Sequence, residues 1–218
     1  DQRKSNPTAW DYQYELATIG YAETLKYQIT TFVNTFGARP SLKDELDAQF
    51  KGIALCLKAQ LNFPYFSSGY LTGIGGSGGH LALDFTADYA VMLSGAQEFV
   101  AEPRSAAAIL YPKGLTDADI IRTAEGMKPT ASFLLERRLV DNVIWEPEEG
   151  AENNPLATAR AIREDMIRVE LEFGHLTPEE ILARRIQRVE DSHPILMGHL
   201  SGKPFDRSRL PFGRFFRH

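Results

Sequence analysis

The sequence predicts an α/β fold. Strand-like runs alternate with helical segments, and two glycine-containing turns each follow a strand and precede a helix. This alternation is typical of a sheet covered by helices. Hydrophobic residues make up 43% of the 218 residues, which is enough for a sizeable core. The two turns, at Gly37 and at Gly78-Gly79, are therefore expected to face one side of the sheet.

The first half of the chain is expected to hold two long helices. Residues 1–9 are polar and predict a flexible arm, and a helix follows over residues 10–26. Ser41 is the expected N-cap of a second helix that runs to about residue 61. The expected apolar face of the first helix holds Tyr14, Ala17, Ile19, Tyr21 and Leu25, and that of the second holds Leu42, Leu46, Phe50, Ile53, Ala54 and Leu57.

Short β-branched and aromatic runs predict the strands. The expected strands cover residues 29–33, 64–72, 89–93, 98–101 and 143–145. Further helices are expected over residues 81–86, 105–111, 116–124, 130–138 and 158–173, and Thr177 begins another. An acidic linker covers residues 146–154. The tail, residues 191–218, is basic and aromatic. It is expected either to dock on a partner or to fold on its own domain.

Charge and composition exclude several classes of function. The net charge of −5 argues against nucleic acid and against an anionic membrane surface as partners. The single cysteine, Cys56, excludes an intrachain disulfide. No apolar run approaches the roughly 18 residues that cross a membrane, and the N-terminal residues lack a signal-peptide core. A cytoplasmic, reducing location is the resulting expectation.

The run from Gly73 to Gly79 is the strongest functional signal, with five glycines in seven residues. Glycine lets a ligand approach the backbone closely, and a helix that starts after the run would direct free N–H groups into the gap. Two N–H groups that converge on one oxygen form an oxyanion hole for acyl chemistry. The structural alternative is a tight strand-to-helix turn. The run matches neither a Walker loop nor a dinucleotide-binding fingerprint.

The side chains near the run leave several roles open. His80 could act as a general base or simply pack on the first helical turn. Ser77 with His80 could form a hydrolase pair. Arg104 could bind an anionic group or pair with an acid. Asp88, Asp117 and Asp119 are expected to be solvated or to cap helices. The histidines show no metal-binding spacing, so no metal is expected.

Several segments, in this order, resemble the carboxyltransferase α subunit of bacterial-type acetyl-CoA carboxylase. They are residues 31–40, 73–83, 87–93, 102–111, 128–131 and 139–147. The resemblance covers about residues 10–190, which is the expected carboxyltransferase domain. It implies a crotonase-like (ClpP/crotonase) superhelix of ββα units with C-terminal helices.

The resemblance also implies a function. A β-type subunit would carry the acyl-CoA site, and carboxybiotin on a biotin carboxyl carrier protein would donate the carboxyl group, within a hetero-oligomer that serves fatty acid biosynthesis. The catalytic backbone donors carried over are Gly37, Ala38, Gly78, Gly79 and His80. The positions expected near carboxybiotin are Gly75, Gly76, Ser77 and Arg104.

The chain departs from the family pattern at several site positions. Asn34 and Phe36 replace an Asp and a Pro, Ile74 and Arg104 replace glutamates, and His80 replaces an Ala. The family's early β-rich turns have no counterpart before residue 29. Two alternatives therefore remain: a biotin-independent crotonase-like decarboxylase or hydratase of acyl thioesters, and a non-catalytic assembly subunit.

Overall fold

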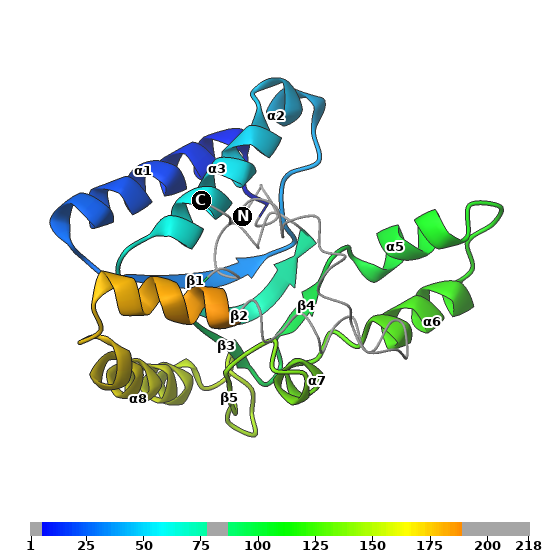
Figure 1. Ribbon diagram of the computed structural model, residues 1–218. Coiled ribbons are helices and arrows are strands. Elements are labelled where there is room, and N and C mark those ends of the chain that lie inside the picture. The colour runs from blue at the N-terminus through cyan, green and yellow to red at the C-terminus, as the bar shows by residue number, and fades with distance from the viewer. Residues whose placement is uncertain (1–5, 78–86, 189–218) are drawn as a thin grey trace, which may run out of the picture. The chain divides into compact units, whose positions relative to one another are not determined.

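The computed structural model describes residues 6–77 and 87–188. Residues 1–185 form one compact unit and residues 186–218 form a second. The first unit is built around a parallel sheet with helices on both faces (Figure 1). Its elements in chain order are α1 (Ala9–Leu25), β1 (Ile29–Thr35), α2 (Leu42–Leu46), α3 (Gln49–Asn62), β2 (Ser67–Gly76), β3 (Tyr89–Leu93), β4 (Gln97–Phe99), α5 (Pro103–Leu110), α6 (Asp117–Met127), α7 (Ala131–Glu136), β5 (Asn142–Ile144) and α8 (Pro155–Phe173).

The sheet has the order β1-β2-β3-β5, and every pairing in it is parallel. β4 pairs with the last residues of β2, also in parallel. Helices α1 and α3 lie on one face of the sheet, and α8 lies on the other (Figure 1). This confirms the predicted α/β class and most of the predicted strands.

The main core lies between the sheet and α8. Phe66 at the edge of β2 stacks on Phe173 of α8, with ring centroids 5.5 Å apart. On the other face, two smaller clusters join α1 to α3: Tyr12 packs with Cys56, and Ile19 packs with Phe63. Parallel strands buried on both faces need such cover on each side.

The prediction of which side of α1 is apolar and buried was wrong at every residue except Ile19. The buried side chains are Ala9, Tyr12, Ile19 and Ala22. Tyr14 and Tyr21 remain 77% and 67% exposed. The reason is a close helix contact: a Cβ placed on Gly52 of α3 would lie 3.0 Å from the Cβ of Tyr12. The helices therefore approach each other on the Tyr12 side, and the other tyrosines face outward.

The predicted helix from Ser41 to about residue 61 is broken into α2 and α3. Ser41 is the N-cap as expected, because its hydroxyl accepts from the Asp44 N–H at 3.1 Å. Ala48 then adopts a left-handed conformation, with φ 62° and ψ 41°. The break rotates the second helix, so that Gly52 and Cys56 are buried. Leu42, Leu46 and Phe50, which were expected on the apolar face, are 77%, 78% and 69% exposed.

The glycine run was expected to be a loop, but its first part is strand. β2 continues through Gly76, and residues 74–76 pair with β4. Glycines permit this because the strand is enclosed between β1 and β4, where a side chain would meet neighbouring backbone. The helix predicted over residues 81–86 lies outside the described residues.

Asp88 was expected to be solvated or capping, and this was wrong. Its side chain is fully buried and forms an ion pair with Arg185, with Nη2 2.7 Å from Oδ2. Arg185 also donates to the carbonyls of Gln60, Leu61 and Phe63 at the end of α3. Asp88 accepts from the N–H and hydroxyl of Ser67. A buried charge is tolerated when it is paired and hydrogen-bonded in this way.

The expected helix starts at Thr116 and Thr177 are confirmed. The Thr116 N–H and hydroxyl donate to Asp119, and the Thr177 N–H donates to Glu180. Across residues 6–77 and 87–188, no helix combines the length and apolarity needed to span a bilayer. The same residues contain no group of three His, Cys, Asp or Glu side chains placed to hold a metal ion.

Candidate active site

The candidate site lies at the carboxyl ends of β1 and β2, where the regular pairing between them is interrupted. Val33 pairs with Leu71, but Thr35 pairs with Gly75. Two residues of β1 thus span four residues of β2, and β2 bulges between the two pairs. Ligands of open parallel sheets bind at the carboxyl ends of the strands, which is where this irregularity occurs.

Side chains of both strands bridge the bulge. Asn34 Oδ1 accepts from the Ile74 N–H at 3.0 Å, and the Thr72 hydroxyl donates to the Val33 carbonyl at 3.2 Å. Gly73 lies directly against the Asn34 carboxamide, since a Cβ placed on Gly73 would be 2.5 Å from Asn34 Oδ1. The bulge therefore depends on a glycine and on a short side chain that carries an acceptor.

Beyond the bulge, the two glycine segments meet backbone to backbone. Gly37 has φ +98°, and a Cβ placed on it would lie 2.1 Å from the Gly76 carbonyl oxygen. A Cβ placed on Gly76 would lie 2.5 Å from the Phe36 carbonyl oxygen. Only residues without a side chain permit this approach. The structure thus brings together the turn at Gly37 and the glycine run, which are far apart in sequence.

Hydrogen bonds fix the turn that contains Gly37. The Gly37 N–H donates to the buried Thr35 hydroxyl at 3.0 Å, and its carbonyl accepts from Asn6 Nδ2 at 2.8 Å. The Arg39 N–H donates to the Pro7 carbonyl at 2.8 Å. For the Ala38 N–H, no acceptor is present among residues 6–77 and 87–188. Of the two expected donors in this turn, the Gly37 N–H is occupied, and the Ala38 N–H has no acceptor within the described residues.

The expected site residues are distributed as follows. Gly37 lies against Gly76, Ala38 follows Gly37 in the same turn, and Gly75 pairs with Thr35 in the ladder. Ser77 is half-buried, with φ +66°. Arg104 is exposed on the first turn of α5, and its side chain has no hydrogen bond or ion pair within the described part of the chain. Gly78, Gly79 and His80 lie outside the described residues.

The groups behind the Gly37 turn are buried and neutral. Ala38 packs on the cluster of Tyr12 and Cys56. Burial, followed by the nearby charge of Glu15, raises the pKa of the Cys56 thiol to about 11. Burial likewise raises the pKa of Tyr12 above its ordinary value. Neither Tyr12 nor Cys56 therefore brings a charge to the Gly37 turn; the nearby charged pair is Arg39 with the buried Asp44, at 3.4 Å.

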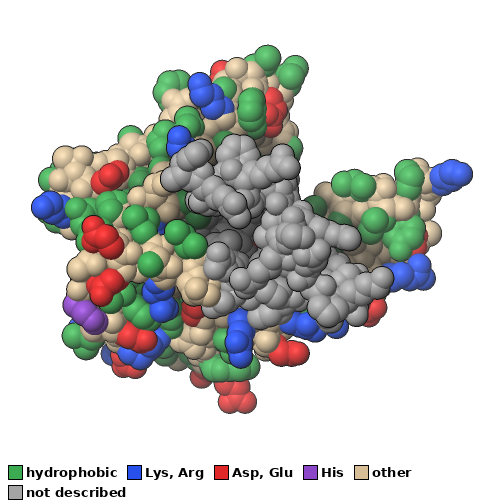
Figure 2. Space-filling model, in the orientation of Figure 1, with side chains coloured by type: hydrophobic (Ala, Val, Ile, Leu, Met, Phe, Trp, Pro, Cys, Tyr) green, Lys and Arg blue, Asp and Glu red, His purple; other side chains and the backbone are tan. Residues whose placement is uncertain are grey.

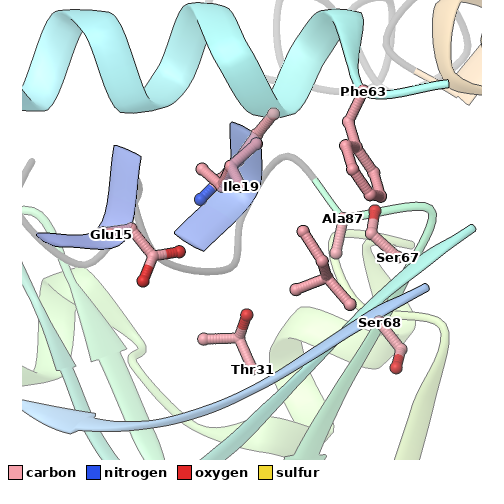
Figure 3. Close-up of a pocket in the computed structure, with 9 residues that line it drawn as sticks. Glu15, Ile19, Thr31, Phe63, Ser67, Ser68 and Ala87 are labelled. Atoms are coloured by element: carbon pink, nitrogen blue, oxygen red, sulfur yellow. The ribbon is translucent and has the colours of Figure 1, made fainter. Parts of the chain in front are cut away.

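A small cavity lies at the opposite ends of the same strands (Figure 3). It has a volume of about 20 Å³ and is lined by residues that include Glu15, Thr31, Phe63 and Ser67. A space of this size suits one water molecule and no organic substrate. Burial raises the pKa of Glu15, which lies beside the cavity. The cavity is thus separate from the glycine site and too small for acyl chemistry.

The sequence missed the roles of Asn34 and Thr35 in shaping the site. Asn34 stood out only as a departure from the family pattern, and Thr35 gave no signal at all. A second polar cluster was also missed: the carboxylate of Asp165 on α8 accepts from the Tyr70 hydroxyl at 3.0 Å and from Asn142 Nδ2 at 2.9 Å. Burial, and then the charge of Asp165, raise the pKa of Tyr89 to about 12.

The described unit is thus a parallel α/β fold in which two glycine segments meet at the carboxyl ends of neighbouring strands. Comparison with known sequences makes the class specific: the chain belongs to the acetyl co-enzyme A carboxylase carboxyltransferase-like family, whose profile matches residues 5–192.

Two curated relatives illustrate the match. The acetyl-coenzyme A carboxylase carboxyl transferase subunit alpha of Gemmatimonas aurantiaca is 35% identical over 179 residues, which cover 81% of this chain and 55% of the relative. The chloroplastic counterpart from Arabidopsis thaliana is 31% identical over 203 residues, which cover 93% of this chain and 25% of the relative. The chain therefore spans about half the length, or less, of the relatives it matches.

Solved structures confirm the fold. A Pseudomonas malonate decarboxylase hetero-tetramer in complex with malonate includes a chain with a TM-score of 0.66 at 15% identity, covering 89% of this chain and 77% of that chain. Transcarboxylase 12S gives a TM-score of 0.58 at 19% identity, covering 64% of this chain and 28% of that chain. These proteins share the crotonase-like architecture that the sequence predicted.

Proposed function

We propose that this chain is the α-type half of a biotin-dependent acyl-CoA carboxyltransferase. The observation that carries the proposal is the backbone contact between Gly37 and Gly76, in a member of a carboxyltransferase-like family. Two glycine segments meet there backbone to backbone, at the carboxyl ends of neighbouring strands. The curated relatives carry the name of acetyl-coenzyme A carboxylase carboxyl transferase subunit alpha.

The proposed reaction moves a carboxyl group from the ureido nitrogen of carboxybiotin to the α-carbon of an acyl thioester. The α-proton of the thioester passes in the opposite direction to the ureido nitrogen, so atoms and charge balance. Negative charge develops on the thioester oxygen and on the ureido oxygen. Fixed N–H donors stabilise both oxygens without a side-chain acid or base.

The residues of the chain divide into donors and surroundings. Ala38 supplies the proposed donor on the β1 side, because the Gly37 N–H is held by Thr35. Gly37 supplies the turn itself. Gly78, Gly79 and His80 are proposed to supply donors on the β2 side. Gly75, Gly76, Ser77 and Arg104 are proposed to lie near carboxybiotin.

The proposed partners are a β-type subunit, which carries the acyl-CoA site, and a biotin carboxyl carrier protein. Large apolar side chains are exposed, including Leu42 and Leu46 on α2 and Ile109 on α5. Figure 2 shows hydrophobic side chains on the surface of these parts of the chain. Exposed apolar groups of this kind support assembly with another subunit. The basic aromatic tail, residues 191–218, is proposed to contribute to docking.

We further propose that the complex acts in the cytoplasm, in fatty acid biosynthesis.

The test is reconstitution with a β-type subunit. We expect the complex to move a carboxyl group between a malonyl thioester and free biocytin. Gly79→Val is expected to reduce the rate by a factor of about 100 or more, because its bulky side chain would keep the reacting carbonyl oxygen away from the backbone donors. Gly126→Ala is the control, since a Cβ on that α6 glycine meets no atom within 4 Å. Full activity of Gly79→Val would overturn the assigned donor.

The same assay separates the alternatives. A biotin-independent enzyme would process the thioester without biocytin, and His80→Ala would lower its rate by a factor of about 100. A non-catalytic assembly subunit would leave the activity of the complex unchanged when the glycine run is mutated. Either result would replace the proposed function.

A further inference from the structure

The bulge in β2 determines which residues reach the candidate site. With regular pairing beyond Val33 and Leu71, Thr35 would face Gly73, but it faces Gly75. The bulge therefore draws the end of β2 back by two residues, or about 6.6 Å at the usual strand rise. The contact between Gly76 and Gly37 exists only in this shifted register. A side chain that stabilises the bulge therefore also stabilises the position of Gly76 against Gly37.

The side chain of Asn34 is placed to stabilise the bulge. Its Oδ1 accepts from the Ile74 N–H at 3.0 Å, within the bulge. Atoms placed at the Cβ position of Gly73 would lie 2.5 Å from Oδ1, 2.7 Å from Cγ and 2.9 Å from Nδ2, so the whole carboxamide lies flat against Gly73. An amide N–H that leaves a strand ladder needs a new acceptor, and Asn34 supplies it.

Two neighbouring hydrogen bonds also stabilise this region, but neither of them involves the Ile74 N–H. Thr72 donates its hydroxyl to the Val33 carbonyl, at the start of the bulge. The Thr35 hydroxyl accepts from the Gly37 N–H, on the turn beyond it. Neither contact satisfies the Ile74 N–H. Asn34 is also exposed, so its contribution to the core is small and its substitution leaves the packing intact.

We propose that Asn34 is a positioning residue for carboxyl transfer: its carboxamide oxygen holds the β2 bulge and thereby aligns the end of β2 with the turn at Gly37. The inference rests on the proposed function and deepens it. Asn34 acts through the backbone of Ile74 to Ser77 and makes no contact with substrate. Because the role needs only an acceptor oxygen, a carboxylate of the same length fulfils it.

The experiment compares two variants of matched size in the reconstituted complex. Asn34→Leu keeps the shape but removes the acceptor, and Asn34→Asp keeps the acceptor. We expect Asn34→Leu to lower kcat by a factor of about 10 to 100, because small displacements of reacting groups are costly. KM is expected to stay within a factor of about 2, since uniform binding is unchanged. Asn34→Asp is expected to restore kcat to within a factor of about 3 of the wild-type value.

A second readout does not depend on activity. Amide hydrogen exchange of Ile74 is expected to accelerate in Asn34→Leu and to remain slow in Asn34→Asp. The control is Asn62→Leu, which removes an exposed asparagine whose Nδ2 donates to the Lys58 carbonyl on α3. It is expected to change neither kcat nor the exchange of Ile74.

The outcomes separate the two proposals. If the wild-type complex shows no carboxyl transfer, the proposed function fails, and the positioning role fails with it. If the wild type is active and Asn34→Leu loses protection at Ile74 while keeping its kcat, the positioning role alone is overturned. Unchanged exchange of Ile74 in Asn34→Leu would overturn the assigned hydrogen bond and the inference built on it.

Discussion

Gly37 combines two constraints that can be measured separately. Its φ of +98° disfavours any side chain, and a Cβ placed on it would lie 2.1 Å from the Gly76 carbonyl oxygen. We expect Gly37→Ala to lower the free energy of unfolding by about 3 kcal/mol, from backbone strain and displacement of β2 together. Urea denaturation followed by circular dichroism measures the change.

The control for this prediction is Gly150→Ala. Gly150 has φ +84°, but a Cβ on it meets no atom within 4 Å. Gly150→Ala is therefore expected to lower the free energy of unfolding only through backbone strain, by about 1 kcal/mol. Equal losses in the two variants would show that the contact between Gly37 and Gly76 carries no energetic constraint.

Glu15 should make stability depend on pH in a direction opposite to that of most carboxyl groups. Burial raises the pKa of Glu15, so the folded chain keeps its proton to a higher pH than the unfolded chain does. The stability linked to this proton is present below the unfolded pKa of about 4.3 and is lost as pH rises through the folded pKa. Glu15→Gln is therefore expected to raise the Tm at pH 7.5 and to leave it unchanged near pH 4.

Thermal unfolding at the two pH values measures this effect. Glu23→Gln, at an exposed position of the same helix, is the control and should change the Tm little at either pH. A rise in Tm that is equal at both pH values would contradict the assigned cause, because it would not follow the carboxylate.

At the scale of elements, the break between α2 and α3 occurs at Ala48, whose side chain disfavours the left-handed conformation that the break requires. Ala48 adopts φ 62° and ψ 41°, a conformation that costs an L-amino acid roughly 1–2 kcal/mol. Ala48→Gly is expected to stabilise the chain by about 0.5–1 kcal/mol, after allowance for the greater freedom of glycine in the unfolded chain. Chemical denaturation measures the gain.

The matched control is a glycine placed within a regular helix. Ala54→Gly on α3 should destabilise by about 1 kcal/mol, because that position is helical. Destabilisation by Ala48→Gly as well would mean that Ala48 continues the helix in solution.

Local signals in the sequence predicted where helices and strands lie better than they predicted which side of each helix is buried. β-branched and aromatic runs located β1, β3 and β5. The caps at Ser41 and Thr177 were found because each cap is a property of four consecutive residues. The buried side of α1 was missed because Tyr12 is selected by Gly52 on another helix. Apolar periodicity alone cannot distinguish Tyr12 from Tyr14.

The candidate site divides in the same way. The glycines marked both segments, since few other roles require so many residues without side chains. Their contact with each other was not predictable, because it depends on the register between β1 and β2. Asn34 and Thr35 act through that register. A single sequence gives no measure of strand register beyond a bulge.

At the scale of the whole molecule, the pair of Asp88 and Arg185 joins the residue that precedes β3 to the helix that begins after Thr177. Their side chains are 0% and 3% exposed. Arg185→Met leaves the carboxylate buried and unpaired, and we expect a loss of about 3–5 kcal/mol. Adding Asp88→Leu should recover about 1–3 kcal/mol, because the unpaired charge is then gone.

Guanidinium chloride or urea titrations of the single and double variants measure the coupling. Lys43→Met serves as the surface control: the pair of Lys43 and Asp47 is largely exposed, so the change should stay within about 0.5 kcal/mol. If the double variant were as unstable as Arg185→Met, the loss would come from the carbonyls that Arg185 caps and not from the charge of Asp88.

The separation of Asp88 and Arg185 by 97 positions has a consequence for the order of folding. All strands of the sheet precede Arg185 in the chain, so the sheet can assemble during synthesis while Asp88 still lacks its counter-charge. A partly synthesised chain must therefore leave this carboxylate in contact with water until the helix that follows Thr177 has been made. Completion of the unit then becomes a late event of high contact order, which follows the synthesis of the whole sheet.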